Sequence, residues 1–114
     1  MPKYLVLYLS SVSAAEQMAS ADPEAGQAGM ELWMNWAGRV GGAMTDMGSP
    51  LNGVATVTAA GSTAGTERPF VGGFSVLEAD SVADVTKLLD DHPHFHAPGD
   101  PSIEVLEFLP IPGM

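Results

Sequence analysis

The sequence contains no cysteine and only four basic residues, Lys3, Arg39, Arg68 and Lys87. The absence of cysteine excludes disulfides, thiolate nucleophiles and cysteine-ligated metal or iron–sulfur centres. Against the four basic residues stand 14 acidic ones, and the formal net charge is −10. Because nucleic acids and anionic membranes bind clustered positive charge, we expect neither as a partner.

Long apolar runs and nucleotide motifs are also missing. The first apolar run, residues 4–9, is too short for the apolar region of a signal peptide or for a membrane span, so the expected location is the cytoplasm. No phosphate-binding glycine loop and no Gly-x-Ser-x-Gly elbow occurs. We therefore expect no nucleotide or flavin cofactor and no serine nucleophile.

What the chain does have is enough apolar sequence for one core. Its 114 residues are 46% hydrophobic, which is too apolar for a disordered acidic tail. A compact monomer of 11.8 kDa would expose about 5,900 Å² of surface. We therefore expect a single domain over residues 1–114.

Apolar patterning predicts alternating strands and helices. A strand buried on both faces is expected at residues 4–9, a helical turn from the Ser13 capping box, and a helix start at Asp22-Pro23. Apolar residues at helical spacing then predict a helix that runs from Met30 to Met47 and ends at Gly48-Ser49-Pro50. The later expectations are strands at residues 54–59, 73–79 and 102–109, a loop at residues 61–65, and a helix from Ser81 to Pro93.

This order is typical of an α+β ferredoxin-like βαββαβ sandwich, with two helices on one face of a four-stranded antiparallel sheet. Two helices cover one face only, yet the first strand is apolar on both. Leu5 and Leu7 alternate with Tyr4, Val6 and Tyr8. An uncovered apolar face usually marks an interface, so we expect a homodimer that packs sheet against sheet.

All three histidines lie within residues 92–96, in the order His92, His94 and His96. In an extended segment their side chains would point the same way, as weak candidates for a metal site with Asp100 as a further ligand. One of them is alternatively a general acid–base group, oriented by Asp46 or Asp100. The third interpretation is a structural loop in which His92 caps the preceding helix.

Three further features leave two interpretations each. Asp46, at the expected C-terminal end of the first helix, opposes the helix dipole and marks either a functional site or a solvated helix end. Gly41-Gly42 indicates close packing of helix on sheet or a ligand near the backbone. Trp33 and Trp36 share a helix face and belong to the core, or Trp36 lines a ligand pocket with Tyr8 and Phe74.

Residues 68–81, Arg-Pro-Phe-Val-Gly-Gly-Phe-Ser-Val-Leu-Glu-Ala-Asp-Ser, resemble the YCII-related (DGPF-type) domain family. The His92-Pro93 pair, the opening strand and the Gly48-Ser49-Pro50 turn extend the resemblance over nearly the whole chain. It implies a ferredoxin-like fold that dimerises, as in the dimeric α/β-barrel superfamily, and a His–Asp pair in a cleft. Asp46 matches the aspartate, whereas Glu31 stands near the position of the family's histidine.

Together these observations predict a small homodimer whose cleft binds an unidentified small molecule, as a cofactor-independent enzyme that uses His/Asp acid–base chemistry. The alternative from another class is a non-catalytic binding, regulatory or accessory module. Elsewhere in the chain no cysteine, cofactor motif or further histidine is available. We therefore expect any catalytic or metal-binding chemistry of this chain to involve residues 92–96.

Overall fold

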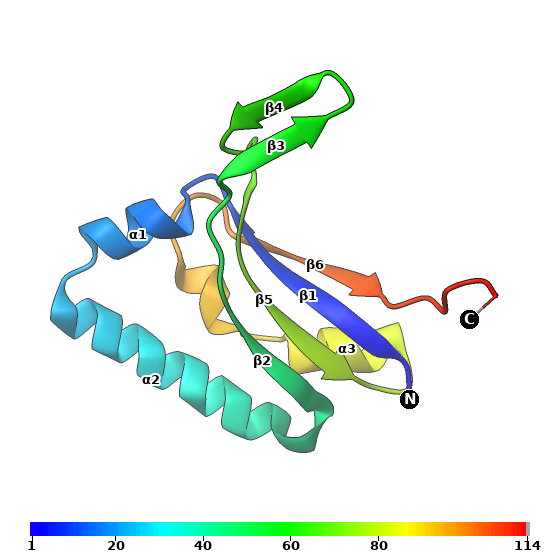
Figure 1. The fold of residues 1–114 in the computed structure, drawn as a ribbon. Coiled ribbons are helices and arrows are strands. Elements are labelled where there is room, and N and C mark those ends of the chain that lie inside the picture. Colours follow the sequence, from blue (N-terminus) through cyan, green and yellow to red (C-terminus); the bar gives the residue numbers. More distant parts are fainter. Residues whose placement is uncertain (114) are drawn as a thin grey trace.

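The computed structural model describes residues 1–113 and is built on a four-stranded antiparallel sheet (Figure 1). Its strands are β1 (Lys3–Ser10), β2 (Met44–Pro50), β5 (Phe70–Glu78) and β6 (Ser102–Glu107), in the order β2-β5-β1-β6. The helices are α1 (Ala14–Ser20), α2 (Pro23–Val40) and α3 (Val82–Leu88), with 3₁₀ turns η1 (Gly41–Ala43) and η2 (Pro93–His96). This α+β architecture is compatible with the expected ferredoxin-like fold.

Each helix begins at a side-chain cap that the sequence predicts. Ser13 accepts a hydrogen bond from the Glu16 N–H, Asp22 from the Ala25 N–H, and Ser81 from the Asp84 N–H. These caps satisfy backbone donors that have no partner inside the first helical turn. They set the start of α2, which carries one wall of the site described below.

The predicted end of the long helix is wrong. It stops at Val40 because Gly41 turns to a φ of 58°, and Met44–Pro50 forms the edge strand β2 instead of a last helical turn. Asp46 therefore lies on a strand and opposes no helix dipole. A Cβ built on Gly41 or Gly42 would meet nothing within 4 Å, so close packing does not explain this pair. Gly41 is needed for the turn that ends the helix.

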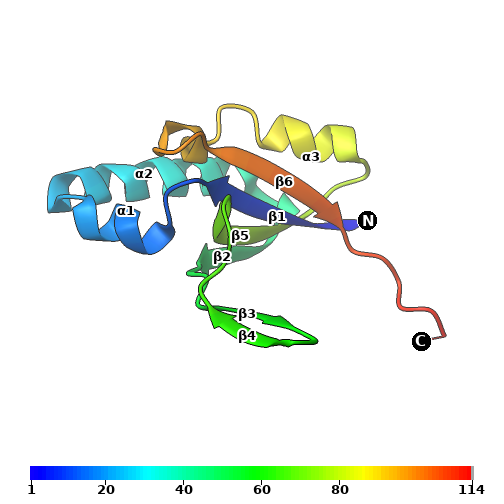
Figure 2. The ribbon, with the colours of Figure 1, turned by 90° about the horizontal axis from the view of Figure 1, so that it is seen from above.

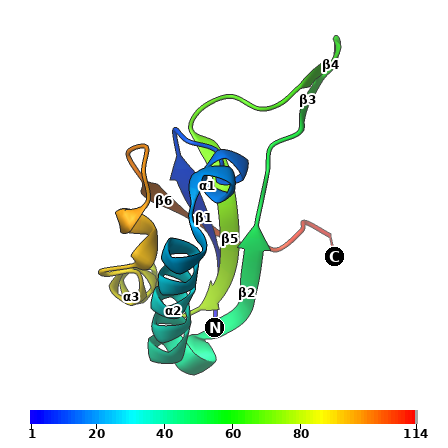
Figure 3. The ribbon, with the colours of Figure 1, turned by 90° about the vertical axis from the view of Figure 1, so that its left-hand side faces the viewer.

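The strand expected at residues 54–59 does not join the main sheet. β3 (Ala55–Thr58) pairs only with β4 (Gly61–Ala64). β4 occupies residues that were expected to form a loop. This hairpin stands away from the sheet (Figures 1 and 3). The strand that completes the sheet is β2, which pairs with β5 and tolerates the positive φ of Gly48. A side chain at Gly48 would overlap the Phe74 carbonyl.

The helices cover one face of the sheet and leave the other open (Figures 2 and 3). On the covered face, Tyr4, Val6 and Tyr8 of β1 and Leu77 of β5 are buried in the core. The register places Leu5 and Leu7 opposite Val76 and Phe74, on the other face, and these four side chains are half-buried. Both faces of β1 are thus apolar, as predicted.

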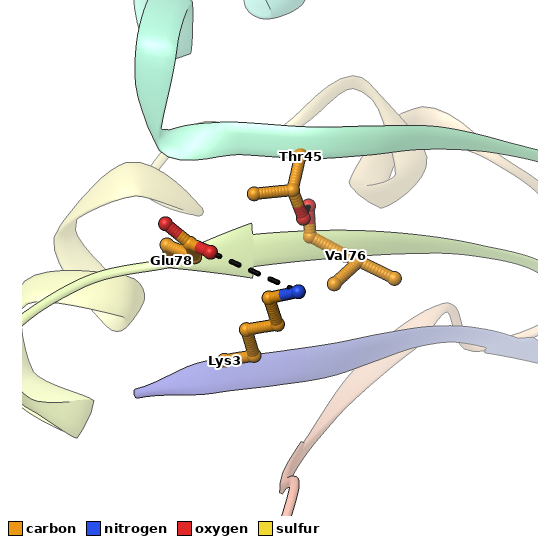
Figure 4. A network of polar contacts seen from close by, with 4 residues as sticks. All are labelled: Lys3, Thr45, Val76 and Glu78. Carbon is orange, nitrogen blue, oxygen red and sulfur yellow. Dashed lines mark hydrogen bonds and ion pairs between the residues drawn. The ribbon is translucent and has the colours of Figure 1, made fainter. Parts of the chain in front are cut away.

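One end of the open face is polar. The Lys3 Nζ lies 4.0 Å from the Glu78 Oε1, and the Thr45 hydroxyl donates to the Val76 carbonyl at 3.2 Å (Figure 4).

The structure exposes 7473 Å², well above the about 5,900 Å² of a compact monomer of this mass. In residues 1–113, no helix combines the length and the apolar character needed to cross a bilayer.

Candidate functional site

Five aromatic rings meet between the sheet and α2, and we call Tyr8, Trp33, Trp36, His92 and His94 the histidine cluster. The His92 ring stacks on Tyr8 with centroids 4.9 Å apart and meets Trp36 at 4.2 Å and Trp33 at 4.6 Å in edge-on contacts. Tyr8, Trp36, His92 and His94 are buried, and Trp33 is half-buried. The cluster joins β1, α2 and the segment that leads into η2.

His92 is completely buried and held in one tautomer. Its Nδ1 accepts a hydrogen bond from the His94 backbone N–H at 2.9 Å, so the proton of the neutral ring is on Nε2. Within residues 1–113 this Nε2 has no hydrogen-bond partner. Burial, with contributions from the charges of His94 and Arg39, lowers the pKa of His92 to about 3. At neutral pH the ring is a hydrogen-bond donor and not a base.

His94 connects η2 to the end of β1. Its Nε2 lies 2.8 Å from the Leu9 carbonyl oxygen, so this nitrogen carries the proton and donates. Burial lowers the pKa of His94, although hydrogen bonds to the backbone of Leu9 and Ser102 oppose the shift. A buried imidazole committed to a main-chain carbonyl positions the loop and has little freedom to exchange protons with a ligand.

A short hydrogen-bond chain extends from the cluster toward β2. The Tyr8 hydroxyl donates to the Ser75 Oγ at 2.9 Å, and the Ser75 hydroxyl donates to the Met47 carbonyl at 2.8 Å. Burial raises the pKa of Tyr8 to about 12, against the lowering effect of Ser75. Tyr8 therefore stays protonated. Its hydroxyl connects β1 through Ser75 of β5 to Met47 of β2, and its ring packs against Trp33 of α2.

A pocket of about 160 Å³ lies on the outer side of Trp36, between α2 and η2. We call it the Trp36 pocket; its lining residues are Leu32, Asn35, Trp36, Arg39, Asp91, Pro93 and His96. It brings an exposed imidazole, a carboxylate, an amide and a guanidinium to one hollow. Of the three histidines only His96 is exposed, so it is the one that can meet a ligand without a structural change.

The structure separates the other predicted site residues from this pocket. Asp46 lies on the edge strand β2, where its Oδ1 accepts from the Gly48 N–H at 2.8 Å. It does not line the Trp36 pocket, and β5 and β1 separate its strand from β6, which follows the histidine segment in the chain. Asp100 is exposed in the loop before β6 and has a φ of 51°. Phe74 pairs with Leu7 and so faces away from Tyr8 and Trp36. Trp36 is the member of the predicted pocket that lines the observed one.

The extended arrangement expected for the three histidines is wrong. Pro93–His96 forms the 3₁₀ turn η2, which directs His92 and His94 inward while His96 stays in solvent. Among residues 1–113, no three histidine, aspartate or glutamate side chains lie close enough together to hold a metal ion. The interpretation in which His92 caps the preceding helix is wrong, because α3 ends at the C-cap Leu89 and His92 instead caps the start of η2 by accepting from the His94 N–H.

Nothing in the sequence singled out Asn35 and Arg39 as site residues, although both line the pocket. The available signal was their spacing: residues 32, 35, 36 and 39 recur at three- and four-residue steps and therefore share one helix face with Trp36. Asp91 directly precedes the histidines in the chain and also lines the pocket. Its φ of 56° is unusual for a residue other than glycine and cannot be read from sequence.

Comparison with known proteins identifies a fold and no family. No family model matches the chain, and no curated protein matches it. Among solved structures, it is similar to a 5-chloro-2-hydroxyhydroquinone dehydrochlorinase from Burkholderia phenoliruptrix, determined in complex with 2,5-dihydroxybenzoquinone. The TM-score is 0.54 at 16% sequence identity, over 94% of this chain and 93% of that one. The likeness is one of fold.

Proposed function

We propose that this protein is a homodimeric enzyme of the YCII-related (DGPF-type) family that uses acid–base chemistry on a small molecule in the Trp36 pocket. The observation that carries the proposal is the meeting of His96 and Asp91 in one hollow beside Trp36. An imidazole transfers protons near neutral pH, and a carboxylate can orient it or take part in the exchange. This chemistry needs no cofactor.

The choice of His96 rests on the state of the other two histidines. His92 and His94 are buried, and burial lowers the pKa of each. His94 is also bound to the Leu9 carbonyl. His96 is exposed and lines the pocket. In this proposal the histidine cluster supports the floor of the pocket, and His96 exchanges protons with the ligand.

The fold neighbour supports an enzyme that handles a small ring compound. Its name describes a dehydrochlorinase, and it was determined with a dihydroxybenzoquinone bound. The family resemblance of residues 68–81 and of His92-Pro93 points in the same direction. A cytoplasmic location also stays part of the proposal, in keeping with the acidic composition of the chain.

Ligand titration tests the role of His96. On addition of 2,5-dihydroxybenzoquinone, we expect the ring signals of His96 in a two-dimensional NMR spectrum to move while those of buried His92 and His94 change little. His96→Gln and Asp91→Asn should weaken binding or turnover of this probe. Asp90→Asn, an exposed neighbour outside the pocket, is the matched control. Unmoved His96 signals in the presence of a bound probe would place the ligand elsewhere and contradict the proposal.

A non-catalytic binding module is the second candidate function. It is favoured by the commitment of two histidines to neutral, main-chain-bonded states, which leaves one accessible imidazole. A module of this kind would bind ligands through the pocket and leave them unchanged. Recovery of every bound probe in unaltered form, with binding that depends on Asn35 and Arg39 but not on His96, would select this alternative.

The dimer in this proposal rests on the open face of the sheet. Leu5, Leu7, Phe74 and Val76 form an apolar strip there. The hairpin and the C-terminal tail extend on the same side (Figures 2 and 3), with Val57 77% and Leu109 74% exposed. The exposed area exceeds that of a compact monomer by more than the about 800 Å² that each partner buries in a standard interface. A second copy would cover this surface.

Sedimentation equilibrium tests the dimer. At micromolar concentration we expect a mass of twice 11.8 kDa. Leu7→Glu should shift the equilibrium to the monomer, because a carboxylate buried without a partner in an apolar interface costs several kcal/mol. Met34→Glu, at an exposed position of α2, should leave the mass unchanged. A wild-type protein of 11.8 kDa under these conditions would rule out the sheet-face dimer.

A further inference from the structure

The Trp36 pocket has two differently charged walls. Asn35 and Arg39 are one helical turn apart on α2, and Asp91 and His96 come from the other side, before and within η2. Leu32, Pro93 and Trp36 supply the apolar surface between them. A ligand that spans the pocket therefore meets a cationic donor at one end and an anionic acceptor at the other.

Arg39 has no carboxylate partner in the part of the chain that the structure describes. The ion pair found among residues 1–113 is Lys3–Glu78, although the chain has 14 acidic residues. Asp91 lines the same pocket as Arg39 without pairing with it. The guanidinium therefore keeps its donors free, and its planar fork of N–H groups matches a carboxylate or a phosphate. The carboxylate is the smaller of the two and suits a pocket of about 160 Å³.

Asp91 restricts the chemistry of the ligand group that can lie at the other end of the Trp36 pocket. Its backbone has a φ of 56°, a conformation that places a non-glycine residue under strain unless its surroundings hold it there. A carboxylate on this wall repels a second negative charge and accepts a hydrogen bond from a hydroxyl group. The volume of about 160 Å³ is below the about 300–1,000 Å³ of pockets for drug-sized ligands, so the ligand is small.

We propose that the Trp36 pocket binds a small monocarboxylate that carries a hydroxyl group at its far end. Arg39, with Asn35, holds the carboxylate, and Asp91 accepts from the hydroxyl beside His96. The inference rests on the proposed function, because it names the ligand class of the same pocket. Arg39 and Asn35 are positioned to bind the ligand, and His96 remains the group that exchanges protons.

Three probes separate the two ends of the pocket: meta-hydroxybenzoate, benzoate and meta-hydroxybenzamide. Titration calorimetry at pH 7 on the full chain should give the tightest binding for meta-hydroxybenzoate. Removal of either the charge or the hydroxyl group should weaken binding, by about 10-fold or more for the charge. Equal affinity for the amide and the acid would overturn the carboxylate assignment.

Two variants with matched controls assign each end to a residue. Arg39→Gln should weaken both acids by about 10-fold or more and leave the amide unchanged, whereas Arg68→Gln, an arginine outside the pocket, should change neither. Asp91→Asn keeps a residue that tolerates positive φ and should reduce the preference for meta-hydroxybenzoate over benzoate. An equal loss in Arg39→Gln and Arg68→Gln would mean a general charge effect and would overturn the proposal.

The NMR signals of His96 distinguish failure of this inference from failure of the proposed function. If meta-hydroxybenzamide moves the His96 signals and the acids bind no better, the carboxylate assignment is wrong and the pocket remains the ligand site. If no probe, 2,5-dihydroxybenzoquinone included, moves these signals, both proposals are wrong. Movement of the His96 signals by 2,5-dihydroxybenzoquinone and by the acids, with tighter binding of the acids than of the amide and loss of that advantage in Arg39→Gln, supports both.

Discussion

Lowering the pH from 7 to 4 is expected to cost the folded protein about 3 kcal/mol through His92 alone. The pKa of this buried imidazole is about 3 in the folded state, against an ordinary value of 6.5. Between these values the unfolded chain binds the proton and the folded one does not. The free energy of unfolding therefore falls as the pH drops below about 6.5, and the loss levels off below about pH 3.

Urea unfolding of wild type and His92→Asn at pH 7, 5.5 and 4 measures this effect. Asparagine retains an acceptor for the His94 N–H, so the variant folds with a smaller core and without the titrating ring. Its stability should fall less steeply with pH than that of wild type. His96→Gln is the control and should keep the wild-type slope. Parallel pH profiles for wild type and His92→Asn would show that His92 is not the cause.

Replacement of Trp36 by alanine is expected to destabilise the fold by about 3–5 kcal/mol, the usual cost of removing a buried tryptophan side chain. Trp36 is 1% exposed, lies against His92 with centroids 4.2 Å apart, and donates from Nε1 to the Leu88 carbonyl at 2.8 Å. Its removal leaves a cavity and an unpaired carbonyl at the end of α3. It also removes the floor of the Trp36 pocket.

Denaturant unfolding compares three variants at this position and its neighbour. Trp33→Ala should cost less than Trp36→Ala, because Trp33 is only half-buried. Trp36→Phe retains an aromatic ring and loses the hydrogen bond to Leu88, so its loss should lie between wild type and Trp36→Ala. A loss below about 1 kcal/mol for Trp36→Ala, the range of an ordinary surface substitution, would contradict the central position that the structure assigns to this ring.

Elements governed by local chemistry were predictable from the sequence. The strand at residues 4–9, the caps Ser13, Asp22 and Ser81, and the two apolar faces of β1 all follow from side chains close in the chain. The end of α2 was not, because Met44 and Met47 continue the helical spacing of the methionines before them. What places these residues in a strand is pairing with β5, about 30 residues later, together with the turn at Gly41.

The candidate site shows the same division. The sequence brings His92, His94 and His96 together because they are neighbours, but their directions depend on η2 and on the packing of α2 against it. Arg39 and Asn35 look like solvent-facing residues until residues 91–96 form the opposite wall of the pocket. The expected pairing of Asp46 with a histidine placed Asp46 at the end of the first helix. That helix ends at Val40, and Asp46 lies on β2. Contacts between residues more than 50 positions apart in the chain form the pocket. The periodicity of apolar residues along a single helix carries no information about such contacts.

The isolated hairpin has a consequence for the evolution and engineering of this fold. β3 and β4 pair only with each other, and the Gly65 N–H donates to the Val54 carbonyl at 2.9 Å to close their base. Because loop-closure entropy grows slowly with loop length, the tip at residues 59–60 can accept inserted sequence at little cost to the main sheet. The hairpin is thus remote from the Trp36 pocket but lies on the side that the proposed dimer covers, so a peptide grafted at its tip would alter association of the two copies and leave the pocket intact.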